Sequence, residues 1–291
     1  MIMIKKIAEF FLLTYFFIAS ASACLVLTTY FLLDRAVKIN ALTAFVFFST
    51  LLFYNFHRVS SYFDGDSFSP AGITKQLKEF STLTKSMLAI STVGIIISAA
   101  LMQVKTLLIV VPLGLITFSY SVPLLKLKGR KKRLREIFLI KIISLAFTWS
   151  LITVTLPMVD TGVSVFSSSS LFLFTERFLF MFAICIPFEI RDLEQEKKWG
   201  NMTLPQRIGI TWSKIAGLQA LLMFLILVYI QFGNAGGSKT FVTLSQGITA
   251  IVAALLLVFT NQTRSNYYFR IFVDGTMQLQ FILLLLFNHS G

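Results

Sequence analysis

Nine apolar runs, each long enough for a membrane-spanning helix, constrain this chain more than any other feature. They lie near residues 10–33, 40–56, 87–104, 106–124, 136–157, 171–188, 213–232, 243–260 and 271–288. An α-helix needs about 20 apolar residues to cross the hydrocarbon core of a bilayer. Lipid offers no partners to backbone N–H and C=O groups, so spanning segments must pair these groups internally, as helices do. We therefore expect an all-α, polytopic membrane bundle of nine transmembrane helices, forming a single domain over residues 1–291.

The composition supports a membrane protein and argues against two other classes. Charged residues make up 13% of the chain and hydrophobic residues 56%, whereas soluble domains carry about 25% charged residues. The first apolar run continues to Leu33, which is too long for the core of a signal peptide, so we interpret it as a retained helix. Cys24 and Cys185 both lie in apolar runs, without the spacing of a metal site or a disulfide framework. The net charge of +13 does not indicate nucleic-acid binding, because lysine and arginine gather on the cytoplasmic loops of membrane proteins.

The distribution of basic residues predicts an orientation. If the N-terminus is cytoplasmic, most lysines and arginines fall on the cytoplasmic side, while Lys141 falls inside a span. The predicted cytoplasmic loops are then about 57–86, 125–135 and 189–212, and the C-terminus lies outside. The basic run KLKGRKKRLRE in the second of these loops is typical of a topology anchor attracted to anionic lipid. We expect a protein of the plasma or inner membrane whose active site faces the cytoplasm.

The third loop carries the most specific chemistry in the chain. It reads IPFEIRDLEQEKKWGNMTLPQRIG, with Glu189, Asp192 and Glu196 spaced by three and four residues. On a continuous helix these offsets place all three carboxylates on one face. Such crowded acids need compensation, and Mg²⁺, which takes oxygen ligands and bridges to phosphates, is a natural partner. Arg191 and Lys197 could hold anionic oxygens beside the metal; a solvated helix end with ion pairs between neighbours is the alternative.

The segment FEIRDLEQEKKWGNMTLP resembles the second acidic motif of the UbiA family of membrane prenyltransferases, which runs acid, two residues, Asp, three residues, acid, then Gly and Thr-Leu-Pro. Tyr120-Ser121-Val122-Pro123 and Leu127-Lys128-Gly129-Arg130 resemble the segment after the family's fourth helix, and Asp274-Gly275 resembles its last span. The resemblance implies a helical bundle with a central lipid-open cavity. It also implies transfer of a prenyl group from a prenyl diphosphate to a small, often aromatic acceptor, with Mg²⁺ gripping the diphosphate.

The resemblance, together with the charge and position of this chain's own side chains, predicts a role for each site residue. The metal ligands would be Glu189, Asp192 and Glu196, and the catalytic residues would be Asp192 and Glu196 together with Arg58. The residues implied to bind the diphosphate are Asn55, Arg58, Tyr120, Lys126, Lys128, Arg191 and Lys197.

The family's first acidic motif is rewritten in this chain. That motif runs Asn, Asp, two residues, Asp, three residues, Asp, but YNFHRVSSYFDGD aligned on Asn55 places Phe56, Val59 and Phe63 at the acidic positions. On a continuous helix Asp64 would lie on the face opposite Asn55, and whether Asp64 and Asp66 substitute for the lost acids or form a loop turn stays open. We expect Arg58 to replace part of the lost metal charge.

Two functions remain open from the sequence. We favour a Mg²⁺-dependent prenyltransferase; the alternative is a catalytically impaired relative that binds an isoprenoid lipid or quinone without turnover. Transport is disfavoured, because no span carries a pair of midplane acids. Glu176 and Arg177, at the edge of the sixth span, are expected to satisfy each other. The acceptor, the prenyl length and the oligomeric state are left open.

Overall fold

A computed structural model of the chain describes residues 10–63, 73–121, 125–127, 130–132, 140–233 and 239–288. Within these ranges, the side chains of residues 60–63, 73–81, 115–121, 125–127 and 130–132 are not described. Asp64, Asp66 and Lys128 lie outside the described residues, and for Tyr120 and Lys126 only the backbone is described.

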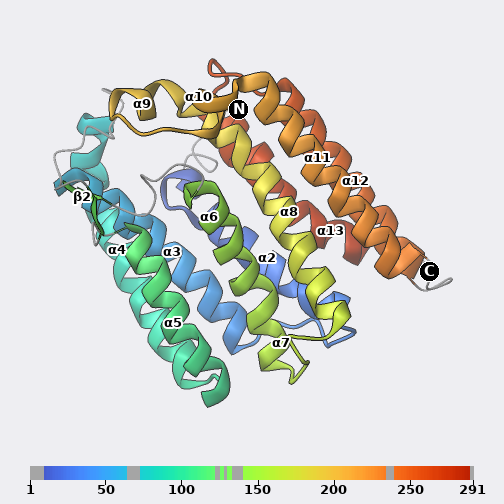
Figure 1. The fold of residues 1–291 in the computed structure, drawn as a ribbon. Helices are drawn as coiled ribbons and strands as arrows, with labels where there is room; N and C mark the ends of the chain where they lie inside the picture. The colour runs from blue at the N-terminus through green and yellow to red at the C-terminus, as the bar shows by residue number, and fades with distance from the viewer. Residues whose placement is uncertain are drawn as a thin grey trace. The chain divides into compact units, whose positions relative to one another are not determined.

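The described residues are almost entirely helical (Figure 1). The α-helices are α2 (Phe16–Leu32), α3 (Ala41–Phe63), α4 (Ile73–Ala100), α5 (Val104–Ser121), α6 (Ile140–Ser150), α7 (Leu156–Asp160), α8 (Ser168–Arg191), α9 (Leu193–Lys198), α10 (Leu204–Ile208), α11 (Ile210–Val228), α12 (Thr240–Phe259) and α13 (Asp274–Asn288). Three π-helical segments, η2 (Leu151–Thr155), η3 (Tyr229–Gly233) and η5 (Tyr268–Val273), continue or begin longer helices. Within the described residues, each predicted apolar run is largely helical, which confirms the predicted helical membrane-type fold.

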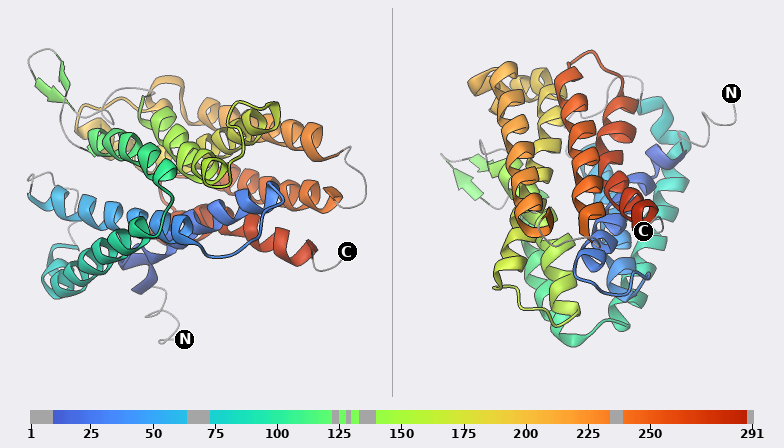
Figure 2. Two further views of the ribbon diagram at one scale, coloured as in Figure 1. Left: turned by 90° about the horizontal axis from the view of Figure 1, so that it is seen from below. Right: turned by 90° about the vertical axis from the view of Figure 1, so that its right-hand side faces the viewer.

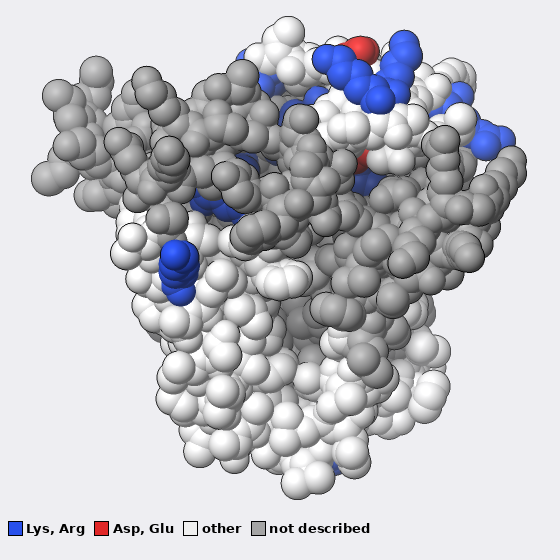
Figure 3. Space-filling view, turned by 90° about the vertical axis from the view of Figure 1, so that its left-hand side faces the viewer, with Lys and Arg blue, Asp and Glu red and all other residues white. Residues whose placement is uncertain are grey.

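By length and composition, six helical segments of the described chain qualify as membrane spans: 82–100, 140–160, 168–191, 210–233, 240–259 and 268–288. Two shorter apolar helical segments, 16–32 and 104–114, accompany them. Large areas of the described surface in Figure 3 carry neither basic nor acidic side chains, as expected for helices that face lipid. The count of nine spans stays a prediction.

One short hairpin departs from the all-helical prediction. Strands β1 (Leu125–Leu127) and β2 (Arg130–Lys132) pair antiparallel, with Leu125 opposite Lys132 and Leu127 opposite Arg130. The hairpin lies within the basic loop predicted for residues 125–135.

The chain divides into two compact units, residues 1–23 with 38–103 and residues 24–37 with 104–291. In the first unit α3 packs along α4. Gly94 permits this approach, because a Cβ atom there would lie 2.4 Å from the ring of Phe48. The same two helices border an apolar groove of about 690 Å³, whose lining includes Phe48, Val93 and Ile97.

The second unit is built around α8, which packs against α6, α11 and α12. Helices α11, α12 and α13 follow one another side by side (Figure 2). The contact between α8, α11 and α12 is close at Gly217 of α11. A Cβ atom there would lie 2.6 Å from Leu257 Cδ2 and 2.9 Å from Ile186 Cδ1. Buried side chains of α8, including Phe180, Ile186 and Ile190, fill the centre of this unit.

A buried polar group lies in the first half of α8. Arg177 does not simply pair with Glu176 as expected from the sequence: its Nη1 donates to Gln280 Oε1 at 2.7 Å and its Nη2 to Leu25 O at 3.5 Å. Glu176 Oε1 is buried and has no hydrogen-bond partner among the described residues. The guanidinium therefore connects α8 to α13 and α2.

Candidate functional site

The end of α8 separates the three predicted metal ligands. Helix α8 contains Pro187 and ends at Arg191, and Asp192 adopts φ −86° and ψ 1° before α9 begins at Leu193. Glu189 therefore lies on α8, Asp192 at the break and Glu196 on α9. The continuous helix expected for the three acids is interrupted at Asp192, whose side chain bonds Arg191, whereas Glu189 and Glu196 both contact Lys141.

Glu189 and Glu196 nevertheless converge on one cation, the ammonium group of Lys141 from α6. Lys141 Nζ lies 2.8 Å from Glu189 Oε1 and 2.8 Å from Glu196 Oε1. The two carboxylate side chains are only 7% and 10% exposed, and the lysine side chain is 22% exposed. Carboxylates removed from water to this degree require a paired charge. The ammonium group therefore supplies the compensation that the sequence analysis assigned to a metal.

The second oxygen of Glu196 is held by Asn201, and a left-handed glycine makes this contact possible. Helix α9 ends with Gly200 at φ +72°. The N–H of Gly200 donates to Lys197 O, and the N–H of Asn201 donates to Glu196 O at 3.0 Å, which is the Schellman pattern of helix termination. This turn carries Asn201 back over α9, where its Nδ2 donates to Glu196 Oε2 at 2.8 Å. The segment Trp199-Gly200-Asn201 thus fixes the orientation of the Glu196 carboxylate.

Gln206 ties the following short helix to the same loop. Its Oε1 accepts from the N–H of Thr203 at 3.2 Å, and its Nε2 donates to Leu193 O at 3.1 Å. Pro205 occupies the first turn of α10, where its missing N–H costs no hydrogen bond. The Thr-Leu-Pro-Gln sequence therefore closes the loop onto the start of α9.

Asp192 pairs with its neighbour in the chain rather than with the other acids. Arg191 donates to it through Nε, at 2.6 Å from Oδ1, and through Nη2, at 3.0 Å from Oδ2. The guanidinium carbon also lies 5.0 Å from the ring centroid of Phe188 and 5.3 Å from that of Phe269, within the range of cation–π attraction. Asp274, at the start of α13, interacts electrostatically with the same arginine and with Arg270.

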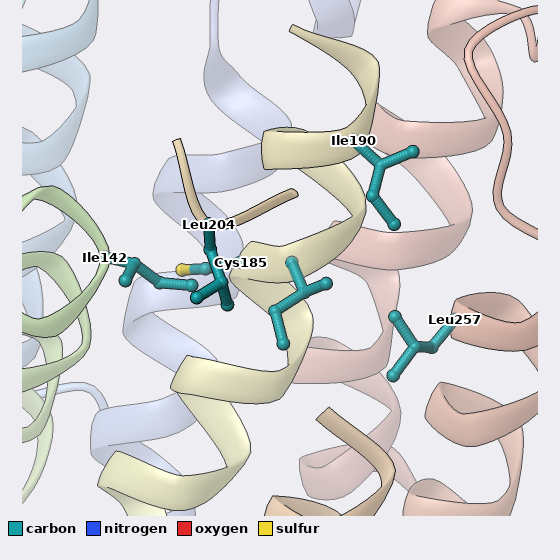
Figure 4. Packing of buried hydrophobic residues seen from close by; sticks show 6 residues of the cluster. Ile142, Cys185, Ile190, Leu204 and Leu257 are labelled. Carbon is teal, nitrogen blue, oxygen red and sulfur yellow. The ribbon is translucent and has the colours of Figure 1, made fainter. Parts of the chain in front are cut away.

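An apolar cluster packs beside the site. Ile142, Cys185, Ile190, Leu204 and Leu257 come from four helices and are all buried (Figure 4). Ile142 follows Lys141 on α6, and Leu204 begins α10. The cluster therefore joins α6, which carries Lys141, to α8, which carries Glu189, by packing as well as by charge.

Asn55 and Arg58 both anchor a break near the N-terminus, in the other compact unit. The first helical residues, 10–13, are separated from α2 by a turn in which Tyr15 has φ +59°. Asn55 Nδ2 donates to Thr14 O at 2.9 Å, and Arg58 Nη1 donates to Leu13 O at 2.8 Å. The two side chains thus satisfy carbonyl groups that the interrupted helix leaves without intrahelical partners.

The structure gives few or no contacts for the remaining residues that the sequence predicts in the site. Lys197 lies exposed on α9. The structure gives no side-chain position for Tyr120, Lys126 and Lys128, and Asp64 and Asp66 lie outside the described residues.

Sequence reasoning missed three residues of the site: Lys141, Asn201 and Asp274. Lys141 offered one signal, since a lysine within an apolar span needs a partner. Asn201 follows a glycine immediately after a charged helix, which is a helix-termination signal. Asp274 was noted only as part of a motif.

The donors present suit a single hard cation. Among the described residues, no group of three or more His, Cys, Asp or Glu side chains is arranged to hold a metal ion. Two carboxylates do converge on one point, however, and Mg²⁺ is commonly bound by one or two carboxylates together with waters and substrate phosphates. Glu189 and Glu196 therefore fit one Mg²⁺, provided that the ammonium group of Lys141 moves aside.

Comparison with solved structures identifies the fold of this chain. Neither a protein-family model nor a curated protein matches the sequence. Among solved structures, a UbiA homolog from Archaeoglobus fulgidus bound to GPP and Mg²⁺ superposes with a TM-score of 0.66 at 12% identity, over 97% of this chain and 99% of that one. The apo structure of a UbiA homolog from Aeropyrum pernix K1 gives a TM-score of 0.62 at 14% identity, over 95% and 97%. This chain has the UbiA fold.

The match to the UbiA fold extends over nearly the whole of both chains, so the arrangement of helices is shared from end to end. At these identities the likeness concerns the fold alone. The chemistry of this chain must be argued from its own residues.

Proposed function

We propose that the protein is an intramembrane prenyltransferase, which transfers a prenyl group from a prenyl diphosphate to a small acceptor such as an aromatic compound. The observation that carries this proposal is the convergence of Glu189 and Glu196 on one cation, in a chain with the UbiA fold. The solved homolog that holds GPP and Mg²⁺ supports a prenyl diphosphate as the substrate class.

In this proposal Glu189 and Glu196 hold Mg²⁺, and Asp192 orients Arg191 toward the diphosphate. The bond between the prenyl carbon and the diphosphate oxygen breaks, a bond from that carbon to the acceptor forms, and the acceptor loses one proton. When bound, Mg²⁺ stabilises the negative charge that develops on the leaving diphosphate. Arg191 and Lys197 add cationic donors near it. Binding of the diphosphate by Asn55, Arg58, Tyr120, Lys126 and Lys128 stays a proposal.

The test is incubation of the purified protein with labelled farnesyl and geranylgeranyl diphosphates and a lipid extract, with and without Mg²⁺. We expect Mg²⁺-dependent release of diphosphate and a labelled lipid product. Glu196→Gln should lower the rate at least 100-fold, because it removes a carboxylate from the metal position. Glu194→Gln, a neighbouring exposed acid on α9, should leave the rate unchanged. No release with either diphosphate, or equal rates for Glu196→Gln and Glu194→Gln, would contradict the proposal.

A second function is supported by a specific feature. The first acidic motif has lost all three acids, at Phe56, Val59 and Phe63, and a lysine lies between two acids of the second. Both features suit a relative that binds an isoprenoid lipid without turnover. Saturable binding of a prenyl diphosphate, with no release of free diphosphate in the same incubation, would favour this second function.

A further inference from the structure

Lys141 is the cation that two nearly buried glutamates share within the second unit. Its ammonium group lies 2.8 Å from one oxygen of each of two glutamates, Glu189 and Glu196, which come from different helices. Since both carboxylates are nearly buried, each would repel the other strongly if the cation were absent. The lysine is thus the link that allows the two acids to lie together.

The charges in this group do not balance. One ammonium group faces two carboxylates, and the further contact of Glu196 is with the neutral amide of Asn201. The adjacent arginine, Arg191, is held by Asp192 through two hydrogen bonds. Counted over the residues whose side chains the structure describes, Lys141, Glu189 and Glu196 together therefore carry one net negative charge where the two acids converge, and this attracts a cation of higher charge than an ammonium group.

The lysine side chain has the exposure and flexibility needed for its ammonium group to move away from the two carboxylates. It is 22% exposed, and a lysine places a compact charge on a flexible four-carbon stem that can reorient. The carboxylates are less free to move, because Asn201 holds that of Glu196, and α8, which carries Glu189, packs on the apolar cluster that includes Cys185.

We propose that Lys141 is an exchangeable counter-ion, whose ammonium group occupies the divalent-cation position between Glu189 and Glu196 and leaves it when a diphosphate arrives with Mg²⁺. The proposal rests on the proposed function, since it concerns the same site. Its consequence is that metal alone competes with a built-in cation and binds weakly. The displaced ammonium group then becomes available to donate to the oxygens of the bound diphosphate.

The test is titration of the purified protein with Mn²⁺, followed by electron paramagnetic resonance, without any diphosphate. Lys141→Met should bind Mn²⁺ at least tenfold more tightly than the unaltered chain, because the competing charge is gone. Lys141→Arg, which keeps the charge, should show no such gain. Lys214→Met is the matched control: this lysine donates to Val258 O, outside the acidic group, so its loss should not change Mn²⁺ affinity.

Removal of a charge from a buried group can destabilise the fold, so a second variant is included. Lys141→Gln keeps a hydrogen-bond donor for the same carboxylates and enters the same titration. Mn²⁺ should also raise the melting temperature of either neutral variant more than that of the unaltered chain.

If both neutral variants bind Mn²⁺ no more tightly than the unaltered chain, the proposal is overturned. A gain of the same size in Lys214→Met would overturn it as well. Because these titrations require no turnover, their failure is separate from a failure to release diphosphate in the prenyl-transfer assay.

Discussion

At the scale of single residues, the structure gives Asn55 and Arg58 a role that their sequence context did not suggest. Both donate to backbone carbonyls at the interruption before α2. Asn55 is 1% exposed, and its Nδ2 also bonds Leu51 O one turn earlier on α3. A buried carbonyl that loses its donor costs about 1–3 kcal/mol, so this amide contributes to the stability of the first unit whether or not it meets a substrate.

We therefore predict that Asn55→Ala lowers the melting temperature of the detergent-solubilised protein in the absence of any ligand. The expected loss is about 1–3 kcal/mol in the free energy of unfolding, since Thr14 O is left without its donor. Asn288→Ala, at the exposed end of α13, provides the control and should leave the melting temperature unchanged. An unaltered melting temperature combined with lost prenyl transfer would instead assign Asn55 to substrate binding alone.

At the scale of elements, the long apolar helices could be predicted, and their interruptions could not. Apolar length decides helix formation in lipid, whereas the break at Tyr15 depends on partners far along the chain, Asn55 and Arg58. The acidic residues of the site were found from their spacing. Their real partner, Lys141, lies on another helix, and only tertiary packing reveals that it meets Glu189 and Glu196.

The contact between α8, α11 and α12 leads to a prediction with an internal control. Gly217→Ala should destabilise the protein by about 1–3 kcal/mol, as overpacking does, because the new Cβ would lie 2.6 Å from Leu257 Cδ2. Gly247→Ala, also within a helix but with nothing within 4 Å of the added Cβ, should stabilise by up to about 1 kcal/mol through helix propensity. Thermal unfolding of both variants in detergent measures the difference. Equal changes in melting temperature for the two variants would show that the close packing at Gly217 does not make an added Cβ atom destabilising.

At the scale of the whole molecule, the orientation in the membrane stays a prediction from the distribution of basic residues. By the positive-inside rule, the basic residues of 57–86, 125–135 and 189–212 predict that these loops lie in the cytoplasm. If this holds, the site at the end of α8 opens toward a cytoplasmic pool of diphosphate, and the segment between α7 and α8 lies on the opposite side.

Cysteine labelling tests this orientation. Ser164→Cys lies between α7 and α8, Ser265→Cys lies between α12 and η5, and both positions are exposed. A maleimide that cannot cross membranes should label Ser164→Cys in intact cells and Ser265→Cys only after the membrane is opened. The native Cys24 and Cys185 lie inside apolar helices, so the unaltered chain is the background control. The reverse pattern would invert the predicted topology.

The turn at Gly200 has a consequence for any attempt to transplant or redesign this loop. Asn201 reaches Glu196 only because one left-handed residue reverses the chain between them. A single inserted residue at this point would carry the amide past its carboxylate, even if every charged group were retained. The stretch from Glu196 to Asn201 must therefore be transplanted as a whole. A graft that copies the acids but not the left-handed turn would keep the negative charge and lose the hydrogen bond from Asn201 to Glu196.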